Sequence, residues 1–248
     1  IIGGGVVGLE FASIFGSFGS KVTVIELLDR VIPFEDEECA KELVRHLKKQ
    51  NVRVETSTKL TGVENTKKGC RVSIEGGADR MFDGVLVSIG RQPVTEGLGL
   101  EKIGIHTDKG FIKVNSHYQT AQSHIFAIGD VIPTAALAHT ASAEAIHAVE
   151  VIAGHTPPVI DYSANPSAIY TYPEVASIGM TTESLKEKGI DFKVAKFPFA
   201  PLAKAKIEGA TEGFVKILFS PQYGEVLGVH IVGARATELI AEFSLGKI

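Results

Sequence analysis

The stretch Ile1-Ile2-Gly3-Gly4-Gly5-Val6-Val7-Gly8-Leu9-Glu10 decides how the rest of this chain is interpreted. Three of its glycines have the spacing G-x-G-x-x-G, directly after apolar residues and ahead of a helical pattern. In that context the first glycine permits a sharp turn, the second lets a diphosphate approach the backbone, and the third lets the helix lie close to its strand. Unpaired amides and the dipole at a helix start favour an anion there. An ordinary glycine turn is the alternative, and the following residues decide between the two.

Apolar residues recur at helical spacing after the glycines and predict an apolar helix face made of Val6, Val7, Ile14, Phe15 and Phe18. Gly19 is the expected end of this helix. A strand over residues 22–25 follows and ends at Glu26, about 20 residues beyond the glycines. A carboxylate there can accept hydrogen bonds from both ribose hydroxyls of an adenosine, whereas it repels a 2′-phosphate. The order of strand, helix, strand and acid therefore predicts a dinucleotide site that favours NAD over NADP.

Composition places the chain among globular proteins. Of its 248 residues 44% are hydrophobic and 22% charged, and the net charge is −4. This length allows one large or two modest domains, and the charge balance gives no electrostatic footprint for nucleic acid. No apolar run approaches the roughly 18 residues of a membrane span. Cys39 and Cys70 are too few for a secreted disulfide framework, which favours a reducing compartment.

The two ends of the sequence suggest an internal portion of a longer protein. The chain begins without Met, inside the apolar strand that the glycine loop needs behind it. Residues 236–248 have the pattern of a helix without a stop signal. We therefore expect further segments on both sides, and targeting signals are not readable from this stretch.

Residues 35–82 are expected to continue the nucleotide-binding unit. An amphipathic helix over residues 35–50 carries Cys39 on its buried stripe, so we expect a packed thiol rather than a reactive one. A third strand at residues 52–55 follows. Residues 58–82 alternate short strands with turns, which is typical of an antiparallel flap.

The continuous apolar run at residues 85–89 predicts a strand buried on both faces. It ends at Gly90, which either lets a ring lie against the backbone or makes an ordinary turn. Pro93, Gly97 and Gly99 then mark a crossover into a second region.

The second region has a signal of its own. A short buried strand at residues 125–128 leads into Gly129 and Asp130, ahead of an Ala-rich helix over residues 136–153. Asp130 either presents an acceptor to the hydroxyls of a sugar or ribityl chain or caps the helix. The backbone amides of residues 137–139 are placed to face the same ligand.

The last region predicts an α+β layer with strands at residues 168–172, 192–197, 214–219 and 226–232. A helix is expected over residues 181–188. Tyr170, Tyr172 and Pro173 are assigned to the core in preference to an interface, and both remain open at this point.

Spaced motifs throughout the chain resemble the dihydrolipoamide dehydrogenases, a family of flavin disulfide reductases. These motifs are residues 3–10 with Glu26, residues 88–93, residues 120–130, residues 137–139 and residues 168–176. The resemblance implies an α/β fold with a Rossmann-like NAD-binding domain at residues 1–90. It implies the C-terminal, returning part of an FAD-binding domain at residues 91–160. Residues 161–248 would then be a truncated α+β interface domain through which the family dimerises.

The resemblance also implies contacts to two cofactors, NAD and FAD. The NAD contacts would be Gly3, Gly4, Gly5, Val6, Val7, Gly8, Leu9, Glu10, Glu26, Leu60 near the adenosine, and Gly90 near the ribose or nicotinamide end. The FAD contacts would be Asp130 to the ribityl chain and the backbone of Ala136, Leu137, Ala138 and His139 to the isoalloxazine edge. Glu10 would lie where nicotinamide meets flavin, although without the family it reads as a helix-surface acid. No catalytic residue and no metal ligand is expected in this stretch.

The activity implied by the family is a relay in which protein-bound dihydrolipoamide reduces a disulfide and electrons pass through FAD to NAD⁺. The family's redox pair is Cys-x4-Cys in a segment before Ile1, and its His-Glu base belongs to a segment after Ile248. Cys39 and Cys70 are about 30 residues apart and do not match that pair. The chain alone is therefore expected to be inactive.

The expected partners are a lipoyl-carrying protein of a 2-oxoacid dehydrogenase or glycine cleavage complex and a second copy of the chain, without nucleic acid or membrane. A cytoplasmic location is expected, with the mitochondrial matrix or a plastid as alternatives. Two other functions stay open. One is another flavin disulfide reductase of the mercuric, glutathione or transhydrogenase type, and the other is a non-catalytic NAD-binding dimerisation fragment. Residues 140–144 and 201–206 depart from the family pattern, which leaves local contacts there open.

Overall fold

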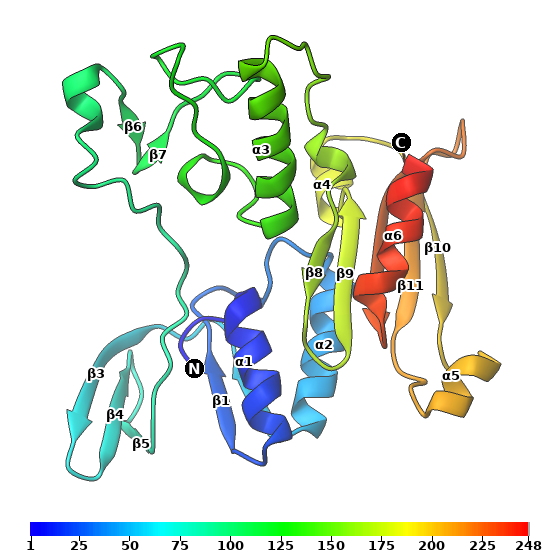
Figure 1. Cartoon of the computed structure of the whole chain (residues 1–248). Coiled ribbons are helices and arrows are strands. Elements are labelled where there is room, and N and C mark those ends of the chain that lie inside the picture. The colour runs from blue at the N-terminus through cyan, green and yellow to red at the C-terminus, as the bar shows by residue number, and fades with distance from the viewer. Residues whose placement is uncertain (248) are drawn as a thin grey trace. The chain divides into compact units, whose positions relative to one another are not determined.

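The computed structural model describes residues 1–247, and these separate into two compact units (Figure 1). The first unit joins Ile1–Gly90 with the chain from Ser163 onward, and the second is Arg91–Tyr162. The chain thus leaves the first unit at Gly90, where the sequence predicts a crossover, and returns to it at Ser163.

The nucleotide-binding part of the first unit is a small parallel sheet. Strand β1 (Val22–Ile25) pairs in parallel with β2 (Val52–Glu55), and Ile2 bridges Ile25 on one side and Val87 on the other. From Ile2 the chain first extends the sheet to one side, through β1 and β2, and then returns to pair on the opposite side. This reversal of direction makes the Ile2 segment the topological switch point of the sheet, where α/β proteins bind ligands.

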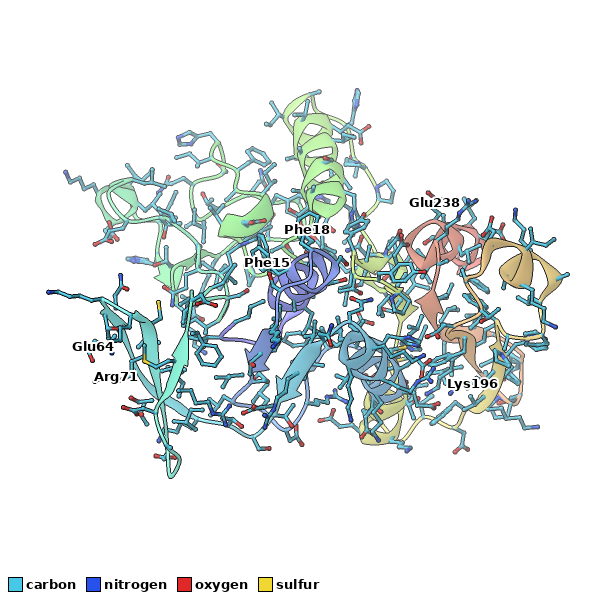
Figure 2. The ribbon with its side chains drawn as sticks, turned by 90° about the horizontal axis from the view of Figure 1, so that it is seen from below. Phe15, Phe18, Glu64, Arg71, Lys196 and Glu238 are labelled. Carbon is cyan, nitrogen blue, oxygen red and sulfur yellow. The ribbon has the colours of Figure 1, made fainter. Side chains whose placement is uncertain are left out.

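Helix α1 (Val6–Ser17) ends as predicted, with Phe18 as its C-cap and Gly19 at a φ of +89°. The apolar face predicted from the sequence is not the face that the helix buries. The helix buries Leu9 together with the small residues Gly8, Ala12 and Ser13. The predicted apolar residues are all exposed, namely Val6, Val7, Ile14, Phe15 and Phe18. Gly8 and Ala12 let the helix backbone approach the sheet, so the large apolar side chains are turned outward. Phe18 is 82% exposed, and Figure 2 labels it beside Phe15 on α1.

Helix α2 (Glu37–Lys49) and the flap match the sequence pattern. Cys39 is fully buried in the same hydrophobic cluster as Leu43 and Leu47, as the helical spacing predicts. Strands β3 (Leu60–Thr66), β4 (Gly69–Ile74) and β5 (Arg80–Phe82) form an antiparallel sheet. The predicted flap is therefore present.

The prediction that residues 85–89 are buried on both faces is wrong. Val87 is 61% and Ile89 is 76% exposed, whereas Leu86 before them and Ser88 between them are partly buried. This alternation is that of a segment covered on one face only. Its backbone does join the sheet, because the Ile2 amide donates to the Leu86 carbonyl at 2.8 Å and the Ser88 amide to the Ile2 carbonyl at 2.8 Å.

The second half of the first unit is a five-stranded antiparallel sheet in the order β10-β11-β12-β9-β8. Its strands are β8 (Ser167–Ile169), β9 (Glu174–Gly179), β10 (Lys193–Pro198), β11 (Phe214–Phe219) and β12 (Val226–Gly233). Its helices are α4 (Thr182–Glu187), α5 (Ala203–Glu208) and α6 (Ala236–Lys247), of which α6 packs on β9 and β12 (Figure 1). Strand β9 and helix α5 were not predicted.

Tyr170 and Tyr172 are exposed, so the prediction that they belong to the core is wrong, while Pro173 is buried. The reason is that β8 ends at Ile169 and β9 begins at Glu174. The tyrosines thus lie in the connecting turn, outside the ladder that would have buried them.

A buried ion pair holds the two halves of the first unit together. The Lys216 ammonium on β11 lies 2.8 Å from the Asp36 carboxylate, which caps α2, and 2.7 Å from that of Glu38. The Thr182 hydroxyl donates to the same Asp36 carboxylate at 2.6 Å. Burial alone would raise the pKa of Asp36, but the bonds from Lys216 and Thr182 outweigh it and lower the pKa to about 2.

The second unit has little regular structure besides helix α3 (Ala138–Ile152). It also contains η1 (Leu100–Ile103), β6 (Thr107–Asp108), β7 (Phe111–Ile112) and η2 (Gly129–Val131), and η3 (Tyr162–Ala164) begins at its last residue. Residues 125–128 form no strand, contrary to the prediction, because only Phe126 makes a bridge, to Gln119. They still pack in the core of the unit, where Ala127 is buried. Of the helices described, none combines the length and apolar character needed to cross a membrane.

Candidate functional site

The glycine loop lies at the carboxyl edge of the parallel sheet, beside Glu26. The Gly4 amide donates to Glu26 Oε2 at 2.5 Å, and the Leu28 amide donates to Glu26 Oε1 at 2.7 Å. Because β1 ends at Ile25, the strand delivers this carboxylate to the loop. The loop and the acid, 22 residues apart in the sequence, thus form one structural element at the switch point.

Each glycine of the fingerprint meets different surroundings. A Cβ on Gly3, whose φ is +101°, would lie 2.1 Å from the Ser88 carbonyl oxygen, and a Cβ on Gly8 would lie 2.1 Å from the Gly3 carbonyl oxygen. A Cβ on Gly5 would meet no atom within 4 Å. Gly3 and Gly8 are therefore required by close packing of the chain, whereas Gly5 leaves open space in front of the helix.

This space has the properties that a diphosphate needs. Gly5 is the N-cap of α1, no side chain caps the helix, and its first turn contains no acidic residue. The first amides of a helix have no partner within the helix and carry partial positive charge. Val6, Val7 and Gly8 supply such amides, while the Gly4 amide is already bound to Glu26. The residues present thus fit the diphosphate of a dinucleotide.

Glu26 keeps acceptor capacity for a ribose. Its two oxygens offer about four lone-pair positions, and backbone amides use one on each. The Thr58 amide donates to the Glu26 carbonyl at 2.9 Å, so the chain passes this site shortly before Leu60, the first residue of β3. Leu60 therefore lies two residues after one that is bound to Glu26, and its contact with the adenosine stays a prediction.

Gly90 and Glu10 occupy different positions. Gly90 has a φ of +129°, is exposed and would meet nothing within 4 Å of an added Cβ. It follows Ser88, which pairs with Ile2, so it lies at the same carboxyl edge as the glycine loop. Glu10 Oε1 accepts the Tyr170 amide at 2.9 Å. This acid is therefore bound to the turn that follows β8 and is more than a helix-surface residue.

Asp130 lies in η2, with its side chain about half exposed and paired to Arg91 at 2.8 Å. It does not cap the following helix, because α3 begins at Ala138 and its N-cap is Leu137. The capping alternative is therefore wrong, and the carboxylate stays accessible to a ligand. Arg91, whose pairing the sequence did not suggest, holds this side chain from outside the turn.

The start of α3 is open to a ligand on its exposed side. Ala136, Ala138 and His139 are exposed, and no side chain caps the helix at Leu137. The Leu137 amide itself donates to the Ala135 carbonyl at 2.8 Å, so this one donor is used within the turn. The accessible helix start and the adjacent Asp130 fit a ligand with both acceptor atoms and hydroxyl groups.

The sequence analysis missed Glu144, an acid with no exposed surface on α3. Its oxygens accept the Gly129 amide at 2.7 Å, the Thr134 hydroxyl at 2.8 Å and the Tyr162 hydroxyl at 2.8 Å. The spacing contains a signal, because Glu144 shares the buried face of the helix with Thr140 and Ala148, four residues to either side.

The two cysteines are both free and differ in environment. Cys39 is buried in α2, and burial raises the pKa of its thiol well above the ordinary value. Cys70 lies in β4 of the flap and is partly exposed. Neither forms the reactive dithiol that disulfide chemistry requires.

Comparison with known families matches both parts of the chain. Residues 1–145 match the model of the pyridine nucleotide-disulphide oxidoreductases, and residues 165–246 match the dimerisation domain of the same family. The first match contains the glycine loop, Glu26 and the turn at Asp130. It accordingly implies a pyridine nucleotide and a flavin as cofactors, FAD and NAD(H).

Individual relatives agree with this assignment. The chain is 44% identical to the dihydrolipoyl dehydrogenase of Bacillus subtilis, over all of this chain and 53% of that protein. It is 43% identical to the mitochondrial dihydrolipoyl dehydrogenase of Pisum sativum, over 99% of this chain and 50% of that protein. Among solved structures, the flavoprotein disulfide reductase RclA of Escherichia coli has a TM-score of 0.93 at 27% identity, covering 99% of this chain and 57% of that one. The chain spans about half the length of the relatives it matches, and it belongs to the pyridine nucleotide-disulphide oxidoreductase family.

Proposed function

We propose that the chain is the NAD-binding, flavin-contacting and dimerising part of a dihydrolipoyl dehydrogenase. The activity proposed for the whole protein is oxidation of protein-bound dihydrolipoamide with NAD⁺ as the final acceptor. The observation that carries the proposal is the 2.5 Å bond between Glu26 and the amide of Gly4 at the carboxyl edge of the sheet. The similarity to dihydrolipoyl dehydrogenases over the whole chain supports it.

The residues of the first unit bind and orient the nucleotide. The open space at Gly5 admits the diphosphate, and the amides that start α1 stabilise its charge. Glu26 accepts hydrogen bonds from the ribose hydroxyls and repels a 2′-phosphate, which selects NAD over NADP. Leu60 borders the adenosine, and Gly90 lets the ribose or nicotinamide end approach the backbone.

The residues of the second unit bind the flavin. FAD, when bound, supplies the electron-pair transfer that links a dithiol to the nicotinamide. Asp130 accepts hydrogen bonds from the ribityl hydroxyls, and the start of α3 at residues 136–139 faces the isoalloxazine edge. The partial positive charge of a helix start favours negative charge at that edge.

We place the redox disulfide and the His-Glu base outside these residues. Cys39 lies on α2 and is buried in the hydrophobic core, and Cys70 belongs to the flap, so neither is suited to attack a disulfide. The chain alone is therefore proposed to bind nucleotide without oxidising dihydrolipoamide. The domain limits remain those proposed from the sequence, with an NAD domain, part of an FAD domain and an interface domain.

The partners and location follow from the same proposal. Two copies of the chain form a homodimer through residues 165–246, which match the dimerisation domain. The substrate is carried on the lipoyl domain of a 2-oxoacid dehydrogenase or glycine cleavage complex. The cytoplasm is the proposed compartment, and relatives with the word mitochondrial in their names make the matrix the alternative.

The experiment that tests the proposal has two arms. The chain is titrated calorimetrically with NAD⁺ and NADP⁺, and the complete protein is assayed for NAD⁺ reduction by dihydrolipoamide. Preferential NAD⁺ binding together with activity supports the proposal. Turnover of mercuric ion or glutathione disulfide in place of dihydrolipoamide would assign another reductase, and NAD⁺ binding without any redox activity would assign a non-catalytic module.

A further inference from the structure

The second unit contains a buried carboxylate that none of the proposed cofactor contacts uses. Glu144 has no exposed surface, yet donors from Gly129, Thr134 and Tyr162 converge on it. A buried carboxylate is costly unless it is fully hydrogen-bonded, so these contacts must form together for the unit to fold as observed. This arrangement calls for a specific reason.

The contacts of Glu144 hold one particular turn. Its Oε2 accepts the amide of Gly129, and Oε1 accepts the hydroxyl of Thr134, so both ends of the segment 129–134 are bound to one side chain. Gly129 has a φ of +68°, and a Cβ there would lie 3.4 Å from that of Ala141 on α3. The turn is thus fastened to α3 by its backbone, directly before Asp130.

The side chain of Asp130 needs this support. Its ion pair with Arg91 is exposed on both sides, and exposed pairs contribute little orientation of their own. The direction in which the carboxylate points is therefore set mainly by the backbone of the turn, which the bond from Gly129 to Glu144 fixes.

We propose that Glu144 is a positioning residue for the flavin, acting through Gly129 to hold Asp130 where the ribityl hydroxyls reach it. The inference rests on the proposed function, because it takes Asp130 as the flavin acceptor. Glu144 itself touches no ligand, since it is fully buried. It acts on affinity only through the turn that it holds.

The experiment uses the complete polypeptide that contains these residues, prepared without flavin and titrated with FAD by fluorescence quenching. Glu144→Leu removes the acceptor at similar volume and is expected to weaken FAD binding about tenfold, the effect of one charge-assisted hydrogen bond. Glu144→Gln is expected to bind FAD with an affinity within about threefold of that of wild type. Its amide oxygen still accepts a hydrogen bond from the Gly129 amide, and its NH₂ group faces hydroxyls that can rotate to accept.

The matched control is Tyr162→Phe, which removes a bond to the other oxygen of Glu144 and leaves the Gly129 amide bound. It is expected to change FAD affinity less than twofold. If Glu144→Leu gives no folded protein, Glu144→Asp takes its place, because one methylene fewer withdraws the carboxylate from Gly129. Equal FAD affinity of Glu144→Leu and wild type would overturn the inference.

A double-mutant cycle separates positioning from general destabilisation. In an Asp130→Ala background, the Glu144→Leu change is expected to cost no further FAD affinity, because the group it positions is gone. A further tenfold loss there would show a merely structural role and overturn the inference. If the wild-type protein binds no FAD, the proposed function fails first, a result distinct from binding that ignores Glu144.

Discussion

The carboxylate of Glu26 is expected to contribute more to NAD binding than any other single side chain of the loop. It has lone pairs left for two ribose hydroxyls beyond the amides of Gly4 and Leu28. A hydrogen bond to a charged group is worth about 1.5 to 3 kcal/mol. Losing the equivalent of one such bond in Glu26→Ala should raise the Kd for NAD⁺ about 10- to 150-fold.

The assay is isothermal titration of the chain with NAD⁺ and with NADP⁺. Glu64→Ala is the matched control, since it removes the same charge from the flap, where Glu64 pairs with Arg71 at 3.1 Å (Figure 2). Glu64 has no contact with the glycine loop, so the Kd of Glu64→Ala for NAD⁺ should stay within about twofold of that of wild type. Thermal melting of both variants checks that the fold is kept.

The titration with NADP⁺ distinguishes two roles of Glu26, direct recognition of the ribose and support of the glycine loop. Without the carboxylate the repulsion of a 2′-phosphate disappears, so Glu26→Ala should bind NADP⁺ no worse than wild type and narrow the preference for NAD⁺. Equal losses for both nucleotides would mean that Glu26 only holds Gly4 in place. A Kd for NAD⁺ within twofold of wild type would refute the reasoning altogether.

Other predictions test the same structure. Gly5→Ala should weaken NAD⁺ binding without lowering the melting temperature, because an added Cβ meets no protein atom within 4 Å but enters the diphosphate space. The pKa of Asp36 is lowered from 3.8 to about 2 in spite of burial, through its bond from Lys216, so ionised Asp36 stabilises the fold by about 2 kcal/mol above pH 4. That contribution is lost as the pH falls toward 2. In urea unfolding, Asp36→Asn should therefore have a lower free energy of unfolding than wild type at pH 7, and the difference should shrink toward pH 2. A difference in the free energy of unfolding that does not change with pH would contradict the assignment. Cys70 should react with a thiol reagent in the native protein, while Cys39, buried and with a raised pKa, should react only on unfolding.

The elements that local pattern specifies were predictable. The amphipathic period placed Cys39 in the core, because a helix of 13 residues with an apolar stripe has only one face to bury. Strand β11 was predicted at residues 214–219 without error, since its burial alternates strictly along the strand. Glycine spacing, a second strand and an acid were sufficient to place Glu26 beside the loop, because all three lie within one βαβ unit.

The failures occurred where burial depends on neighbours that the sequence does not name. Hydrophobicity predicted an apolar face of α1 that includes Phe15 and Phe18. That face is exposed, because the close contact of a helix with a sheet selects small residues, and Gly8 faces inward. Val87 and Ile89 were assigned to a strand buried on both faces, although within the first unit one face is covered. An apolar run indicates that burial of a segment would be favourable, but whether the segment is buried depends on the elements that pack against it.

Carboxylates that bind backbone amides explain how the two turns proposed to contact the cofactors keep their shape. A turn without a regular hydrogen-bond ladder keeps its shape when an acceptor from another element binds one of its backbone amides. Glu26 does this for Gly4, and Glu144 does it for Gly129, each from a different element. The two carboxylates differ in exposure, so their removal should have different effects on cofactor binding. Because Glu26 is only partly buried and still has lone pairs, its loss should change which nucleotide binds, whereas the loss of the enclosed Glu144 should change only how tightly the flavin binds.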